Sequence, residues 1–301
     1  MNARNPRPPL LTLACALVLA ASPLAARDAK EPTIEMRGVS SSDANTWEQS
    51  GRALPSIAAY KDGKAGAVSL TFDDGFRGQV ENALGILDPL GVKGTFFVIP
   101  LRMEAGNKAS IGYGQAKDMV ANGHEIGTHA AVAEKLHQVS AQRLDEIVNG
   151  GHDLILENVG IDPVSLAMPG GSKFDDRVEK VVLEKHPVVR QMSVLPNVAK
   201  IRGYGSVGNR KWTDPKARDR IREAADNGQW FVGYIHAIVS GYSPFKSKDE
   251  FRGHVKWLTE QDDIWVAPMG EVGLYALARE GATLEITSLE PQTNRPGNMS
   301  F

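Results

Sequence analysis

Two acidic side chains capable of proton transfer or metal binding stand directly after an apolar segment of the chain. Asp73 and Asp74 follow the run Ala67–Phe72, and Gly75 then permits a sharp turn. With two adjacent carboxylates, one can bind a cation while its neighbour accepts a proton. The same Asp-Asp-Gly sequence also suits an ordinary turn, so this segment alone does not establish a site.

Histidines stand at the ends of two further apolar segments. His124 and His129 flank Glu125–Thr128. They are an odd number of positions apart, so they point to opposite faces of a regular strand, and His129 is the one placed to face a site. His236 follows the apolar run Trp230–Ile235, where an imidazole can give or take a proton near neutral pH. Either histidine alone could be structural, and a lone histidine such as His129 is more often structural than a ligand.

Short apolar runs and amphipathic segments alternate from residue 65 onward. Strands are predicted at 67–72, 95–99, 125–128, 164–168, 188–194, 230–235 and 264–267, with helices between them. Such alternation implies an α/β fold with a parallel sheet and right-handed crossovers. About seven units favour a distorted (β/α)7-type barrel, in which chemistry collects at the C-terminal ends of the strands.

The N-terminal segment has the order of a secretory signal peptide. Arg4 and Arg7 precede the apolar run Leu10–Ala21, and small residues follow. We expect residues 1–26 to be removed on export to the periplasm or medium, a retained anchor being the alternative. Residues 27–64 are expected to form an irregular lead-in and 65–282 the barrel. A short strand and a loose tail are expected over 283–301.

The amino-acid composition limits the possible metal ligands and partners of the protein. Cys15 is the only cysteine and lies in the signal segment, so the mature chain can form no disulfide, and a metal must be held by His, Asp or Glu. The net charge of −2 does not point to nucleic acid as a partner. No later apolar run reaches the about 20 residues of a spanning helix, so no membrane partner is expected after cleavage. Oligomeric state is not predicted.

Several segments occur together in a characteristic order. They are Ser69–Gly75, Lys93–Val98, Gly123–His129, Ala167–Gly171, Tyr234–His236 and Ile264–Ala267. In this order they resemble the polysaccharide deacetylase family, also called the NodB-homology or carbohydrate esterase 4 domain. The resemblance covers residues 65–280 and implies a NodB-like barrel. It also implies a divalent-metal hydrolase, with Zn²⁺ as the expected ion, that removes N- or O-acetyl groups from a polysaccharide or oligosaccharide.

The resemblance also implies roles for individual residues. By motif position, Asp73 is the catalytic base and His236 the acid that protonates the leaving group, while Asp74 and His129 are metal ligands. The family motif places a second histidine ligand one helical turn after His129. That position is Ala133, which cannot ligate a metal.

Three explanations are open for Ala133. Glu134 or His137 could supply the missing ligand, although Glu134 would need a non-helical loop to do so. Water could take the position, with weaker metal binding. The domain could instead be catalytically impaired and bind carbohydrate on the same fold. A hydrolase is the main hypothesis, and an amidase or deformylase of small substrates is a further enzymatic alternative.

Residues that could line a substrate cleft are less specific. Pro169 and Gly170 form a tight turn after a strand, and Trp212 and Tyr242 could stack on sugar rings. Met168 stands where the family usually has an aromatic residue or an arginine, so the arginine that tunes the base is not found there.

Three other histidines receive structural interpretations. His254 lies at helical spacing with apolar residues and is expected at the flank of the core, and His152 and His186 are expected on helix surfaces.

Overall fold

The computed structural model describes residues 17–18, 33–37, 44, 48–49, 56–106, 108–190, 204–207, 217–239, 243–280 and 282–286. The strands are β1 (Leu17–Val18), β2 (Thr33–Met36), β3 (Gly66–Phe72), β4 (Thr95–Val98), β5 (Glu125–Thr128), β6 (Ser165–Ala167), β7 (Val188–Arg190), β8 (Tyr204–Val207), β9 (Trp230–Ile235), β10 (Ile264–Val266) and β11 (Thr283–Ile286). The helices are α2 (Arg77–Gln79), α3 (Gly85–Leu87), α4 (Pro100–Glu104), α5 (Tyr113–Ala121), α6 (Ala141–Val159), α7 (Asp176–Leu183), α8 (Ala217–Asp226), α9 (Lys248–Thr259) and α10 (Met269–Glu280). Short turns of other helix types are η1 (Lys61–Gly63), η2 (Val80–Leu84), η3 (Asp88–Leu90) and η4 (Leu136–Gln138).

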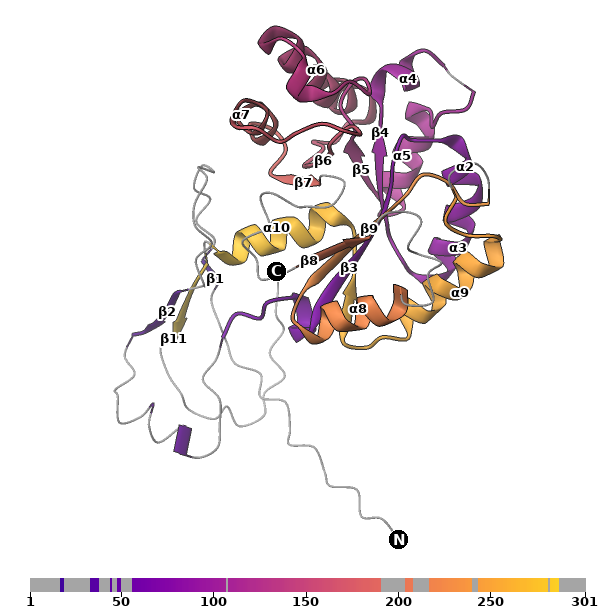
Figure 1. Ribbon diagram of the computed structural model, residues 1–301. Coiled ribbons are helices and arrows are strands. Elements are labelled where there is room, and N and C mark those ends of the chain that lie inside the picture. The colour runs from indigo at the N-terminus through magenta and orange to yellow at the C-terminus, as the bar shows by residue number, and fades with distance from the viewer. Residues whose placement is uncertain are drawn as a thin grey trace. The chain divides into compact units, whose positions relative to one another are not determined.

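The larger of two compact units, with residues 58–277, is built on a curled parallel sheet (Figure 1). Its strand order is β7-β6-β5-β4-β3-β9-β8, and β10 also pairs with β3. The pairings are parallel, as expected where helices connect successive strands. The predicted α/β barrel of parallel strands is confirmed.

The helices cover both faces of this sheet. On the convex face, Ile86 of α3, Met119 of α5, Ile221 of α8 and Phe251 of α9 join one buried cluster. On the concave face, Met269, Val272 and Ala276 of α10 join Phe97 and Val188 in a second cluster. Helix α10 therefore lies within the curl of the sheet, as Figure 1 shows.

Strand β3 lies at the centre of the sheet, and all of its residues are buried. Leu70 and Phe72 face the convex side, where the Phe72 ring stacks on Phe96 with centroids 4.5 Å apart. Thr71 faces the concave side and donates a hydrogen bond from Oγ1 to the Gly233 carbonyl at 3.0 Å. Burial on both faces explains why this strand reads as a continuous apolar run.

The smaller unit contains β2 and β11, which pair in parallel. Leu284 and Ile286 of β11 are buried there. Strand β2 lies within 27–64, the range predicted as an irregular lead-in, and β11 lies within 283–301, the range predicted to hold a short strand and a loose tail. Of the expected signal segment 1–26 only Leu17–Val18 is described, and residues 287–301 lie outside the described part.

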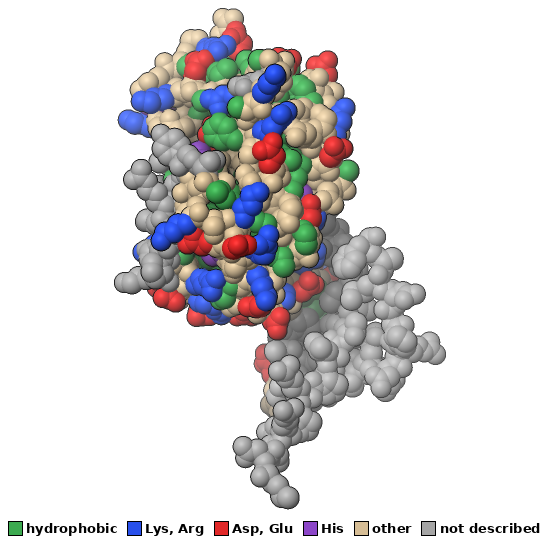
Figure 2. All heavy atoms as spheres, turned by 90° about the vertical axis from the view of Figure 1, so that its right-hand side faces the viewer, with side chains coloured by type: hydrophobic (Ala, Val, Ile, Leu, Met, Phe, Trp, Pro, Cys, Tyr) green, Lys and Arg blue, Asp and Glu red, His purple; other side chains and the backbone are tan. Residues whose placement is uncertain are grey.

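The described ranges contain no helix long and apolar enough to cross a membrane. Figure 2 shows one side of the molecule, on which acidic and basic side chains are interspersed.

A glycine in α6 fixes the loop that follows β5. Helix α6 begins after Ser140, whose side chain caps it by accepting a hydrogen bond from the Arg143 amide. Within α6, a Cβ added to Gly151 would lie 2.7 Å from the Ala131 amide nitrogen. That amide donates to the Ile147 carbonyl at 2.7 Å, so the loop and the helix are in direct backbone contact.

We therefore expect opposite effects from alanine at two adjacent positions. Gly151→Ala should lower the free energy of unfolding by about 1–3 kcal/mol, because its methyl group would push the loop away. Gly150→Ala is the matched control, since nothing lies within 4 Å of its added Cβ, and it should gain about 0.5–1 kcal/mol from helix propensity. Urea unfolding of both variants tests this, and equal effects would contradict the close contact.

Candidate active site

Two candidate residues follow strands that are paired in register. Asp73 follows Phe72, the last residue of β3, and His236 follows Ile235, the last residue of β9. Phe72 and Ile235 are register partners, and the Asp73 amide donates to the Ile235 carbonyl at 2.9 Å. Asp73 and His236 therefore stand next to each other at the C-terminal ends of neighbouring strands.

Asp73 is a buried carboxylate with a buried partner. It is 4% exposed, and Arg190 donates a hydrogen bond from Nη2 to its Oδ1. Burial raises the pKa of Asp73, but the positive charges of Arg190, His129 and His236 outweigh burial and hold this pKa below its ordinary value of 3.8. The Asp73 carboxyl is therefore ionised at neutral pH and can accept a proton.

Arg190 is the last residue of β7 and lies between two aromatic rings. Its guanidinium carbon is 5.3 Å from the centroid of the Phe97 ring and 5.0 Å from that of Tyr234, which favours a fixed planar cation. Gly127 makes room for this arrangement, because a Cβ there would lie 2.6 Å from the Phe97 ring.

Arg190 is not among the predicted site residues, because the family resemblance places this arginine before Pro169. Arg190 is two positions after Val188 and so shares a face of the strand with it, which could have pointed to a role for Arg190. The strand was predicted over 188–194, however, which put Arg190 in its middle rather than at its end.

Asp74 lies at the rim between two basic groups. Its Oδ1 is 3.5 Å from Nη1 of Arg102, and its Oδ2 is 3.8 Å from Nε2 of His236. The backbone of Asp74 has φ 71°, a left-handed conformation that non-glycine residues rarely adopt.

The same backbone conformation recurs after two other strands of the site. Ala130 follows His129 with φ 59°, and Val239 lies shortly after His236 with φ 79°. Such strained residues concentrate at functional sites. The ends of β3, β5 and β9 therefore share a feature typical of an active site.

His129 is held in one orientation. Its Nδ1 lies 2.7 Å from the Ala167 carbonyl, to which only a protonated nitrogen can donate. In the neutral ring this leaves the lone pair on Nε2, the tautomer found when a backbone carbonyl orients a histidine ligand. His124 lies on the opposite side, with Nε2 2.9 Å from Asp88.

Gln79 connects the two strand ends that carry Asp73 and His236. Its side chain is fully buried, and its Nε2 donates both to the Asp73 carbonyl and, at 2.9 Å, to the His236 carbonyl. No pattern in the sequence singles out this glutamine, because it lies in the short helix α2 with no apolar periodicity around it.

The donor set does not fit a three-ligand metal site. Asp74 and His129 are present, but Ala133 is exposed in a non-helical segment, contrary to the expected helical turn. Glu134 bonds instead to Arg143 at 2.6 Å, and Nδ1 of His137 accepts from the Lys173 amide at 3.1 Å. The described residues contain no group of three or more His, Cys, Asp or Glu able to hold an ion.

The predicted cleft residues are only partly visible. Pro169 is buried and Gly170 exposed in the loop after β6, while Trp212 and Tyr242 lie outside the described residues.

Comparison with known proteins agrees with this geometry. Residues 60–187 match the family model for polysaccharide deacetylase. Over this segment, which is less than half of its length, the chain resembles the polysaccharide deacetylase family. A gellan lyase from Bacillus sp. is 26% identical over 276 residues, covering 81% of this chain and 11% of the lyase. The peptidoglycan-N-acetylglucosamine deacetylase PgdA of Listeria monocytogenes is 26% identical over 185 residues, covering 60% of this chain and 37% of PgdA.

The chain therefore spans only part of the length of both relatives. A crystal structure of a candidate polysaccharide deacetylase from Mycobacterium smegmatis matches with a TM-score of 0.54 at 19% identity, covering 82% of this chain and 100% of the other. At this identity the likeness shows the fold, and it confirms the NodB-like barrel.

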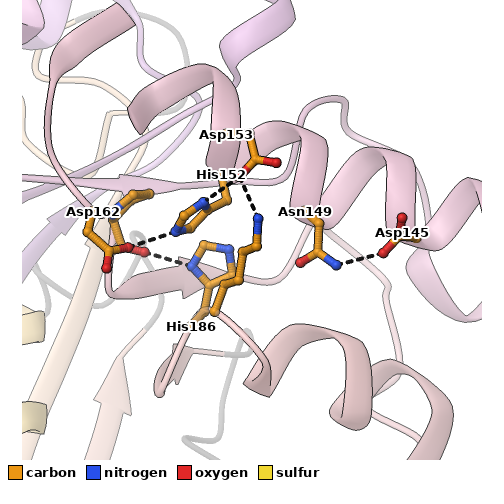
Figure 3. Close-up of polar contacts among 8 residues, drawn as sticks. Asp145, Asn149, His152, Asp153, Asp162 and His186 are labelled. Carbon is orange, nitrogen blue, oxygen red and sulfur yellow. Dashed lines mark hydrogen bonds and ion pairs between the residues drawn. The ribbon is translucent and has the colours of Figure 1, made fainter. Parts of the chain in front are cut away.

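A second cluster of histidines and carboxylates lies elsewhere in the larger unit (Figure 3). His152 of α6 places Nδ1 3.0 Å from Asp153 and Nε2 2.7 Å from Asp162. His186 places Nδ1 2.8 Å from the Pro163 carbonyl. Both histidines are buried, so the expectation that they lie on helix surfaces is wrong. Burial lowers the pKa of His186 to about 4.

The ion pair at the centre of the site yields one prediction. Arg190→Met should lower the free energy of unfolding by about 3–5 kcal/mol at neutral pH, because Asp73 would remain buried without its partner. In the unmodified protein, Asp73 contributes stability above 3.8 that is lost as pH falls through its lower folded pKa. In the variant this pKa should rise, so the deficit should shrink in acid. Denaturation at several pH values measures it, with the exposed Arg252→Met as control.

His186 yields a second prediction, on acid stability. An unfolded histidine binds its proton near pH 6.5, whereas folded His186 does so only near 4. The unfolded state therefore gains protons first, and His186 should reduce stability as pH falls from 6.5 towards 4. His186→Asn should flatten this part of the stability profile. An unchanged slope would contradict the buried, neutral state of His186.

Proposed function

We propose that the domain hydrolyses acetyl groups from a polysaccharide or oligosaccharide, with Asp73 as general base and His236 as general acid. The observation that carries this proposal is the register of β3 and β9, which sets Asp73 and His236 at neighbouring strand ends, where the charge of His236 helps to lower the pKa of Asp73. The match of residues 60–187 to the polysaccharide deacetylase family model supports the reaction type.

The chemistry requires two proton transfers. A water molecule loses a proton as it attacks the acetyl carbonyl, and Asp73 can accept that proton because its carboxyl is ionised. The bond from carbonyl carbon to nitrogen or oxygen then breaks, and the leaving atom needs a proton. His236, whose side chain is 28% exposed, can deliver it from the rim. Gln79 keeps both strand ends at a fixed separation.

The place of a metal in this reaction is a separate question. The resemblance predicts Zn²⁺ with Asp74 and His129 as ligands, and these residues have suitable chemistry. Catalytic zinc sites use three protein ligands with an open position, and the described residues supply two of them. No step above passes through an ion.

The relatives and the N-terminus support the choice of substrate and compartment. PgdA is a deacetylase of N-acetylglucosamine in peptidoglycan, a polymer of the kind we propose here. The signal-like order of residues 1–26 supports export to the periplasm or medium.

Substitution of the base tests the proposal. Asp73→Asn should lower the rate of acetate release from acetylated oligosaccharides by about 10²–10⁴-fold, because the amide cannot accept the proton. His236→Gln should lower it by a similar factor. Asp118→Asn, at an exposed carboxylate on α5, is the control and should leave the rate unchanged. Binding of the oligosaccharide without acetate release by the unmodified protein would contradict hydrolysis and favour the carbohydrate-binding alternative.

A further inference from the structure

Asp74 already has a cationic partner that belongs to the chain. Arg102 of α4 places Nη1 3.5 Å from Oδ1 of Asp74, closer than the 3.8 Å between His236 and Oδ2. A guanidinium stays protonated at every physiological pH, unlike an imidazole. The carboxylate expected to bind an ion therefore lies beside a permanent positive charge.

The backbone connects Arg102 to the segment that lacks the second histidine. Helix α4 directly follows β4 and begins with Pro100. The amide of Leu101 donates to the Ala131 carbonyl at 3.4 Å, which joins α4 to the loop that leads to Ala133. Arg102, which supplies the positive charge, and Ala133, which replaces the expected histidine ligand, therefore lie on two segments that are in direct backbone contact.

A divalent ion at this position would meet two obstacles. It would have to compete with Arg102 for Asp74, and like charges at short range repel strongly. Of the other predicted ligands it would find only His129, because Glu134 and His137 bond elsewhere.

We infer that Arg102 is the resident cation of this site, neutralising Asp74 in place of a divalent ion, and that the protein does not bind Zn²⁺ there. Arg102 is a positioning residue in this role, since it acts through Asp74. This inference concerns ion binding alone. It can fail while the proposed hydrolysis holds, and the proposed hydrolysis can fail while this inference holds.

Zn²⁺ titration by calorimetry tests this, using the full chain after dialysis against a chelator. The unmodified protein should show no stoichiometric Zn²⁺ binding. Ala133→His restores the family's ligand, and the exposure of Ala133 leaves space for it. The double variant Arg102→Gln/Ala133→His should bind one Zn²⁺ at least about tenfold more tightly than Ala133→His alone, the scale on which neighbours of metal ligands act.

The matched control is Arg102→Gln/Ala133→Gln, which removes the charge without adding a ligand and should not bind. Thermal melting checks that each variant is folded. One tightly bound Zn²⁺ in the unmodified protein would overturn the inference. So would equal Zn²⁺ affinity with and without Arg102, or the absence of Zn²⁺ binding by every variant, since removal of the guanidinium would then have released no ligand.

Discussion

The buried ion pair between Asp73 and Arg190 is the constraint on which the site depends. The two residues stand on β3 and β7, which are separated in the sheet by β4, β5 and β6. Only a curled sheet can bring such distant strands within hydrogen-bond distance across its concave face. Two buried charges are costly unless each satisfies the other, so the curl and the pair support one another. The charged Asp73 carboxylate that results is what a proton-accepting site requires.

Much of this arrangement could be predicted from the sequence. The alternation of apolar runs and amphipathic segments predicted the parallel sheet, and the ends of two predicted strands located Asp73 and His236. Arg190 was missed because the predicted strand ran past it, so it did not stand at a strand end. The left-handed backbone at Ala130 has no signature in side-chain type, and without it the segment after His129 was interpreted as a helical turn. Gln79 was missed because buried polar clamps follow from three-dimensional contacts rather than from periodicity.

Arg102 explains how the site can tolerate Ala133 in place of a metal ligand. Loss of a metal ligand would ordinarily leave Asp74 as a partly buried carboxylate with weaker compensation. A guanidinium within 3.5 Å supplies that compensation from a neighbouring segment. Positions 102 and 133 therefore act together on Asp74. Its carboxylate has a positive neighbour whether that neighbour is a metal ion or a guanidinium. His129 retains its carbonyl-oriented tautomer in either case.

The absence of a side chain at Gly127 limits which residues can occur together in domains of this kind. A methyl group at that position would meet both the Phe97 ring and, at 2.5 Å, the Ser165 hydroxyl. The ring would shift, and the aromatic slot that holds Arg190 would open. The position of Arg190 on β7 therefore depends on a glycine, Gly127, on β5, which lies two strands away in the sheet. Joint occurrence of these two residue types, in chains that lack an arginine ahead of the Pro-Gly turn, offers a sequence criterion for recognising similar domains in which an arginine on this strand pairs with the carboxylate at the position of Asp73.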